Sequence, residues 1–184
     1  MLRPDPVPGT GVWKSSVAPP AGLLGLALLA VAISAATILG ALAFEHIGGY
    51  QPCALCLMQR TPYYLGIPIA AVAALAIAFR WNTKWAALLL GLFALLMLYN
   101  AGLAAYHSGV EWRFWEGPAS CAPTVGVSNV EDMLDQLENQ HPPSCTDAAW
   151  RFLGLSFAGW NFLIAAFLAA LAVYGARKAW RAVR

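Results

Sequence analysis

Four long runs of apolar residues alternate with polar segments along this chain. The runs cover about residues 21–44, 61–79, 85–106 and 152–176, and each holds 19 to 25 residues without a charged side chain. A helix needs about 20 apolar residues to cross the roughly 30 Å hydrocarbon layer of a bilayer. The pattern therefore predicts an all-α membrane protein, a bundle of four transmembrane helices.

The segments outside these runs differ in length and composition. Residues 1–20 are rich in proline and glycine and show no hydrophobic period, which predicts a flexible tail, and residues 177–184 form a short basic tail. The run at 21–44 is longer than the roughly 7 to 15 apolar residues of a signal peptide, so we interpret it as an uncleaved first span. Two polar loops, 45–60 and 107–151, are predicted on the opposite side of the membrane from the tails.

The longer loop contains the pattern of one short amphipathic helix, over residues 128–140. Ser128 and Glu131 fit a capping box at its start. Apolar residues then recur at the i, i+3, i+4 and i+7 positions of a helix, namely Val130, Met133, Leu134 and Leu137. Two interpretations stay open, a helix that packs on its own loop and a helix that lies on the bilayer surface.

Composition agrees with a membrane location, and the basic residues indicate an orientation. Hydrophobic residues make up 60% of the 184 residues and charged residues only 11%, against roughly 25% charged in soluble domains. The net charge of +2, without a basic run interleaved with aromatics outside the C-terminal tail, indicates no nucleic-acid partner. Eight of the eleven Lys and Arg residues fall on the side of the two tails. The positive-inside rule then predicts cytoplasmic termini.

All four cysteines fall in the two loops on the other side. In a bacterial inner membrane this side faces the periplasm, an oxidising compartment where paired thiols are more often disulfides than metal ligands. The sequence suggests two pairs, Cys53 with Cys56 and Cys121 with Cys145. A zinc site made of the same four thiolates is the competing interpretation.

The Cys-x-x-Cys pair lies where a helix is expected to begin. Pro52 precedes Cys53, and the first turn of a helix stabilises a thiolate through its unpaired amide groups. Arg60, four residues after Cys56, is expected about one turn away. Haem attachment is disfavoured because Leu57 stands where histidine is required. A structural disulfide that closes only two intervening residues constrains almost nothing, which favours a reactive dithiol.

A Cys121–Cys145 disulfide, in contrast, suits a structural role, because it would close a loop of 23 intervening residues. If both pairs exchange, electrons move from one to the other and then need an acceptor outside the protein. A dithiol at the edge of the bilayer can reach a lipid-soluble quinone. Arg60 is then a candidate for stabilising the negative charge that develops, and simple snorkelling of Arg60 is the alternative.

Three motifs, in this order along the chain, resemble the disulfide bond formation protein B (DsbB) family. The resemblance covers about residues 21–176. Its motifs are Cys53-Ala54-Leu55-Cys56 with Gln59-Arg60; Tyr106-His107 ahead of Trp115-Glu116-Gly117-Pro118 and Cys121; and Trp150-Arg151-Phe152-Leu153-Gly154-Leu155-Ser156 after Cys145.

This resemblance implies a quinone-dependent oxidoreductase of the bacterial inner membrane that reoxidises a DsbA-like periplasmic thiol oxidase and passes electrons to ubiquinone or menaquinone. It implies that Cys121 forms the mixed disulfide with the partner and that Cys145 then exchanges with Cys53. Cys56 is implied as the thiolate at the quinone, with Arg60 beside it and His107 as a further candidate for the quinone pocket. No metal is implied.

Two other classes remain possible at this stage. A vitamin K epoxide reductase type of enzyme also combines a helical bundle, a Cys-x-x-Cys pair and a quinone, but its loop cysteines precede that pair, whereas here they follow it. The other class is a non-enzymatic membrane protein with structural disulfides or a four-cysteine zinc site.

A DsbA-like partner is a strong oxidant, with a reduction potential of about −120 mV. We therefore expect Cys53–Cys56 to be the more oxidising pair and the loop at 107–151 to move during turnover.

Overall fold

The computed structural model describes residues 18–121 and 145–183. Its four long helices are α1 (Leu23–His46), α2 (Ala54–Ala78), α3 (Thr83–Glu111) and α5 (Phe157–Arg181). Between α3 and α5 lie a 3-10 turn (Ala119–Cys121) and an antiparallel hairpin of β1 (Arg151–Phe152) and β2 (Leu155–Ser156). The amphipathic helix predicted over residues 128–140 lies outside the described residues.

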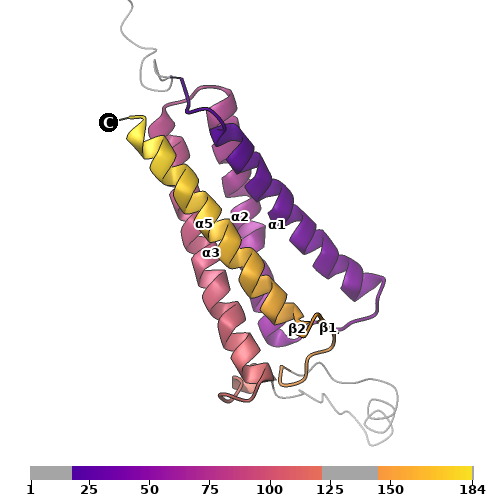
Figure 1. Cartoon of the computed structure of the whole chain (residues 1–184). Helices are drawn as coiled ribbons and strands as arrows, with labels where there is room; N and C mark the ends of the chain where they lie inside the picture. The colour runs from indigo at the N-terminus through magenta and orange to yellow at the C-terminus, as the bar shows by residue number, and fades with distance from the viewer. Residues whose placement is uncertain (1–17, 122–144, 184) are drawn as a thin grey trace, which may run out of the picture.

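The four helices pack side by side and alternate in direction (Figure 1). The start of α1 and the end of α5 lie at one end of the bundle, and the β1–β2 hairpin lies at the other. Each helix is long and apolar enough to cross a bilayer. The predicted all-α, four-helix membrane fold is therefore confirmed.

Large apolar side chains remain exposed along the outside of the bundle, for example Leu39 and Leu95, which are 66% and 64% exposed. In water such a surface would drive association, whereas lipid tails are as apolar as these side chains. The inside of the bundle is instead lined by small residues. Alanines from all four helices are buried there, and an added Cβ at Gly66 would meet the ring of Phe93 at 3.0 Å. Small residues let the helix backbones approach closely, as membrane helices require.

The helices differ from the predicted spans mainly at the end that carries the cysteines. Helix α2 begins at Ala54, ahead of the apolar run at 61–79 and as expected from the position of the Cys-x-x-Cys pair. Cys53 caps it: the Cys53 sulfur accepts a hydrogen bond from the Cys56 N–H at 3.2 Å. Helix α3 continues past residue 106 to Glu111. Part of each predicted loop is therefore helical, and the polar residues of those parts take fixed positions at the end of the bundle.

Helix α5 begins at Phe157, whereas hydropathy alone predicts a span from residue 152. Residues 151–156 form the hairpin, and its two-residue turn places Leu153 and Gly154 at positive φ, the backbone conformation that a type I′ turn requires. Ser156 then caps α5 by accepting a hydrogen bond from the Gly159 N–H. Apolar side chains in a turn count toward hydropathy in the same way as those in a helix, which is why the prediction was wrong here.

Gly109 provides a test of the packing near the cysteines. A Cβ at this position would overlap the ring of Trp115, which stacks on Tyr106 and donates a hydrogen bond to its carbonyl oxygen. We expect Gly109→Ala to destabilise the protein by about 1–3 kcal/mol, the usual cost of overpacking, seen as a lower thermal midpoint in detergent. Gly102→Ala is the matched control on the same helix, because an added Cβ there meets no atom within 4 Å. Equal midpoints for the two variants would contradict this packing.

Candidate redox-active site

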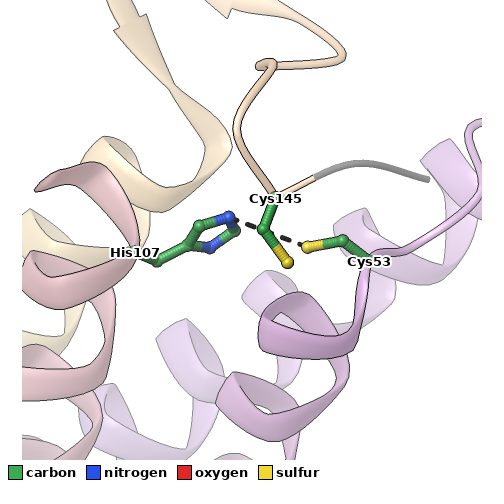
Figure 2. A group of neighbouring side chains, drawn as sticks. All are labelled: Cys53, His107 and Cys145. Atoms are coloured by element: carbon green, nitrogen blue, oxygen red, sulfur yellow. Dashed lines mark hydrogen bonds between the residues drawn. The ribbon is translucent and has the colours of Figure 1, made fainter. Parts of the chain in front are cut away.

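The four cysteines form two disulfides, Cys53–Cys56 and Cys121–Cys145. The two bonds are neighbours: Cys53 Sγ, Cys145 Sγ and a ring nitrogen of His107 all lie within 4.8 Å of one another. Figure 2 shows these three side chains converging from the start of α2, from α3 and from the segment that precedes β1. All three are buried. The two disulfides therefore meet at one point at the end of the bundle.

The chemistry of this point follows from its surroundings. Val110 and Leu55 pack around the sulfurs, so solvent is excluded from Cys53 and Cys145. Cys121 is less buried and lies in the 3-10 turn. An arriving thiol thus meets Cys121 more easily than the two sulfurs inside. In this state all four sulfurs are oxidised, so they offer no thiolates for the zinc site that the sequence left open.

His107 is held by a chain of side-chain hydrogen bonds that crosses the bundle. Its Nε2 lies 3.7 Å from Cys53 Sγ, and its Nδ1 lies 2.8 Å from Gln59 Nε2. Asn161 donates from Nδ2 to Gln59 Oε1 at 2.6 Å, and the Tyr63 hydroxyl donates to Asn161 Oδ1 at 2.7 Å. The chain joins α2, α3 and α5 and fixes the imidazole against the sulfur. His107 is therefore closer to the disulfide chemistry than its predicted place in a quinone pocket suggests.

A buried carboxylate stands beside the same imidazole. Glu111 follows His107 by one helical turn, and its Oε1 lies 3.8 Å from His107 Nε2. Its other oxygen accepts a short hydrogen bond from the Ser156 hydroxyl. The Glu111 and His107 side chains are both almost fully enclosed, since only 9% of Glu111 and 3% of His107 is exposed.

A cavity of about 280 Å³ lies next to the Cys53–Cys56 disulfide. Cys56, Arg60 and His107 all contribute to its lining. Most of the remaining lining is apolar or aromatic, including Ala41, Phe44, Tyr50, Phe157, Trp160 and Ile164. Phe44, Tyr50 and Phe157 also contact one another edge to face. The cavity thus offers aromatic faces together with a few polar groups next to a reactive sulfur.

Arg60 takes part in an ion pair that sequence reasoning missed. Its guanidinium donates to the carboxylate of Glu45, near the end of α1, and both side chains line the cavity. This pair neutralises the charge of Arg60 and ties α1 to α2. Arg60 therefore faces the cavity beside Cys56, as predicted, but with a carboxylate partner.

The structure brings together every predicted site residue: Cys53, Cys121, Cys145 and His107 at the junction of the disulfides, and Cys56, Arg60 and His107 around the cavity. Sequence reasoning missed Glu45, Gln59, Glu111 and Asn161 as site residues. A signal existed for Glu111, because His107 and Glu111 are four residues apart and therefore share a helix face. Gln59 stood in one of the family motifs, but its contact with Asn161 gave no signal, because 102 positions separate the two residues.

Four apolar helices that end at two adjoining disulfides define a class of protein, the multi-pass membrane thiol–disulfide oxidoreductases. Residues 24–175 match the model of the family described as disulfide bond formation protein DsbB. The chain therefore belongs to the DsbB family and not to the vitamin K epoxide reductase type. It is an oxidoreductase that acts on disulfides, which also sets aside the non-enzymatic alternative.

Similar proteins cover most of the chain. A disulfide bond formation protein B of an Acidovorax species is 31% identical over 84% of this chain and 89% of its own length. The protein of that name from a Polaromonas species is 32% identical over 75% of this chain and 80% of its own length. An uncharacterized protein of Rickettsia prowazekii is 28% identical over 76% and 79%. No solved structure gives a significant match.

Proposed function

We propose that the protein is a protein-disulfide:quinone oxidoreductase of a bacterial inner membrane that reoxidises a DsbA-like periplasmic thiol oxidase. The observation that carries this proposal is the proximity of Cys53 Sγ and Cys145 Sγ, within 4.8 Å of each other. Thiol–disulfide exchange requires a thiolate to reach a disulfide sulfur directly. Two disulfides at this separation can exchange after only a small movement.

In this proposal a thiolate of the reduced partner attacks Cys121 Sγ, which breaks the Cys121–Cys145 bond and leaves the electron pair on Cys145. Cys145 then attacks Cys53 Sγ, and the Cys53–Cys56 bond breaks with the electron pair on Cys56. The partner's second thiol attacks the partner–Cys121 bond, which releases the partner as a disulfide and leaves Cys121 as a thiolate. Cys121 then attacks Cys145 Sγ, so that the Cys121–Cys145 bond forms again and Cys53 leaves with the electron pair. Two electrons have then moved from the partner to the pair next to the cavity. The greater exposure of Cys121 supports its role as the point of entry.

The cavity fits the ring of ubiquinone or menaquinone. A cavity of roughly 150 Å³ already binds benzene, so about 280 Å³ accommodates a substituted ring. Bound there, a quinone supplies the acceptor for two electrons and two protons. Cys56 lines the wall where electrons would leave, the aromatic side chains provide stacking faces, and Arg60 and Gln59 offer N–H groups to ring oxygens. The same apolar lining excludes water from the thiolate.

The arrangement of charges supports the proposed orientation. Arg80 lies between α2 and α3, Lys84 lies in the first turn of α3, and Arg177 and Lys178 lie near the end of α5. These residues share the end of the bundle where the described chain begins and ends. The disulfides lie at the opposite end. By the positive-inside rule this distribution supports cytoplasmic termini and periplasmic cysteines.

Trapping the exchange tests the proposal without a quinone. In the double variant Cys56→Ser, Cys121→Ser, only Cys53 and Cys145 remain, and we expect them to form a disulfide on isolation, because their sulfurs lie within 4.8 Å. Peptide mapping of the unreduced protein by mass spectrometry measures the linked fraction.

The matched control is Cys53→Ser, Cys121→Ser, which leaves Cys56 and Cys145. We expect much less linkage there, because Cys56 lies further along α2 and faces the cavity. If the folded Cys56→Ser, Cys121→Ser protein, isolated under air, kept Cys53 and Cys145 as free thiols, the result would contradict the relay.

A further inference from the structure

We propose that Glu111 is a positioning residue for the exchange between the two disulfides: through His107, it holds a proton beside Cys53 and Cys145. The inference rests on the proposed relay and assigns a role to a residue outside the cysteines and the cavity lining. It starts from an unusual placement, a carboxylate buried at the point where the two disulfides meet.

Burial of an ionised carboxylate costs several kcal/mol unless hydrogen bonds and opposite charge compensate. Glu111 accepts a hydrogen bond from the Ser156 hydroxyl. Its second oxygen is directed at His107 Nε2, 3.8 Å away. A carboxylate so placed favours a positive charge on the imidazole. A proton taken up by His107 would in turn offset the cost of burying an ionised Glu111.

The imidazole is held from both sides. Gln59 contacts Nδ1 at 2.8 Å, and Nε2 faces both Glu111 Oε1 and Cys53 Sγ, at 3.8 and 3.7 Å. A carboxamide can present either its nitrogen or its oxygen, so Gln59 can hold the neutral ring or, after rotation, the protonated ring. In both states Nε2 stays directed at the sulfurs. His107 can therefore change protonation without losing its position.

Proton transfer accompanies the exchange in a balanced way. His107 takes up the proton that the attacking thiol has lost, and as an imidazolium it holds its Nε2–H beside the thiolate of Cys145. The Cys145–Cys53 bond forms, and the Cys53–Cys56 bond breaks with its electron pair left on Cys56 Sγ. When Cys121 later attacks Cys145, the Cys121–Cys145 bond forms again, Cys53 leaves with an electron pair, and Nε2 gives its proton to Cys53. The Glu111 carboxylate stabilises the imidazolium between these two steps.

The test follows a single exchange in quinone-free protein, with reduced glutathione as the probe. Glutathione attacks Cys121, forms a mixed disulfide there and releases Cys145. Samples are quenched in acid at intervals and alkylated, and mass spectrometry measures the Cys53–Cys145 bond and alkylated Cys56. We expect Glu111→Gln to slow the appearance of this bond about tenfold. This is a part of the rate enhancement of roughly 10²–10⁴-fold that positioned acid–base groups contribute. Glu111→Asp keeps the charge and should restore most of the rate.

A double-mutant cycle separates positioning from a structural role. In a His107→Asn background, which we expect to be slow already, Glu111→Gln should cause no further loss, because its effect passes through the imidazole. Glu116→Gln, which alters an exposed carboxylate in the following segment, should match the wild type. An unchanged rate in Glu111→Gln, or an equal loss with and without His107, overturns the inference while leaving the relay intact. Absence of the Cys53–Cys145 bond in the wild type overturns the relay as well.

Discussion

Replacement of Cys56 by serine is expected to abolish quinone reduction. Cys56 is the sulfur of the Cys53–Cys56 pair that lines the cavity, and a hydroxyl at this position neither forms a disulfide nor leaves as a thiolate. Loss of a residue that forms a covalent bond during turnover costs at least about 10³-fold in rate. The measurement is single-turnover oxidation of a reduced periplasmic dithiol oxidase by purified protein with ubiquinone, followed by quinone absorbance.

Cys121→Ser is the matched control for this experiment. It should lose oxidation of the protein partner, because its point of entry is gone, yet still reduce quinone when dithiothreitol supplies electrons directly to the Cys53–Cys56 pair. Quinone reduction that persists in Cys56→Ser would assign the electron exit to another group. A wild type that reduces no quinone and carries zinc would leave the fold correct and the proposed chemistry wrong.

Replacement of Arg60 by alanine is expected to have the next largest effect. The guanidinium lines the cavity beside Cys56, where negative charge develops during electron transfer. Removal of one preorganised donor to a developing anion lowers the rate about 10²–10³-fold, and we expect kcat/KM for the quinone to fall by about 10²-fold. Arg60→Lys keeps the charge but loses the planar guanidinium, so its kcat/KM should fall between the values for the wild type and for Arg60→Ala. Steady-state kinetics at varied quinone concentration measure these values.

Glu45→Gln distinguishes this role from a structural one. The Glu45 carboxylate is the ion-pair partner of Arg60, and its removal leaves the guanidinium at the cavity with its full charge. If Arg60 acts on the quinone, Glu45→Gln should keep most of the activity that Arg60→Ala loses. Equal losses in the two variants, with equal falls in thermal midpoint, would mean that the pair only ties α1 to α2. A simple snorkelling role would lower stability and leave kcat/KM unchanged.

Much of the architecture was open to prediction because its causes are local in the chain. The length of an apolar run determines whether a helix can cross a bilayer, and the four runs became α1, α2, α3 and α5. The position of Cys53 at a helix start followed from Pro52 and the apolar residues beyond it. Both disulfide pairs were also suggested by cysteine number and spacing, and both form. Helix ends were less predictable, as the hairpin at residues 151–156 illustrates, because turns and caps depend on backbone geometry that hydropathy does not record.

The contacts between segments that lie far apart in the chain were decided only by packing. His107 meets Cys53 across 54 positions, and Gln59 meets Asn161 across 102, because α2, α3 and α5 approach one another closely through small side chains. The same packing brings Cys145 to Cys53 and Glu45 to Arg60. Residue types and spacing thus determined which groups could react and at which end of the bundle they lie. The crossing of the helices determined which of them meet, because side-chain proximity across a bundle depends on interhelical distance and rotation, which no local pattern encodes.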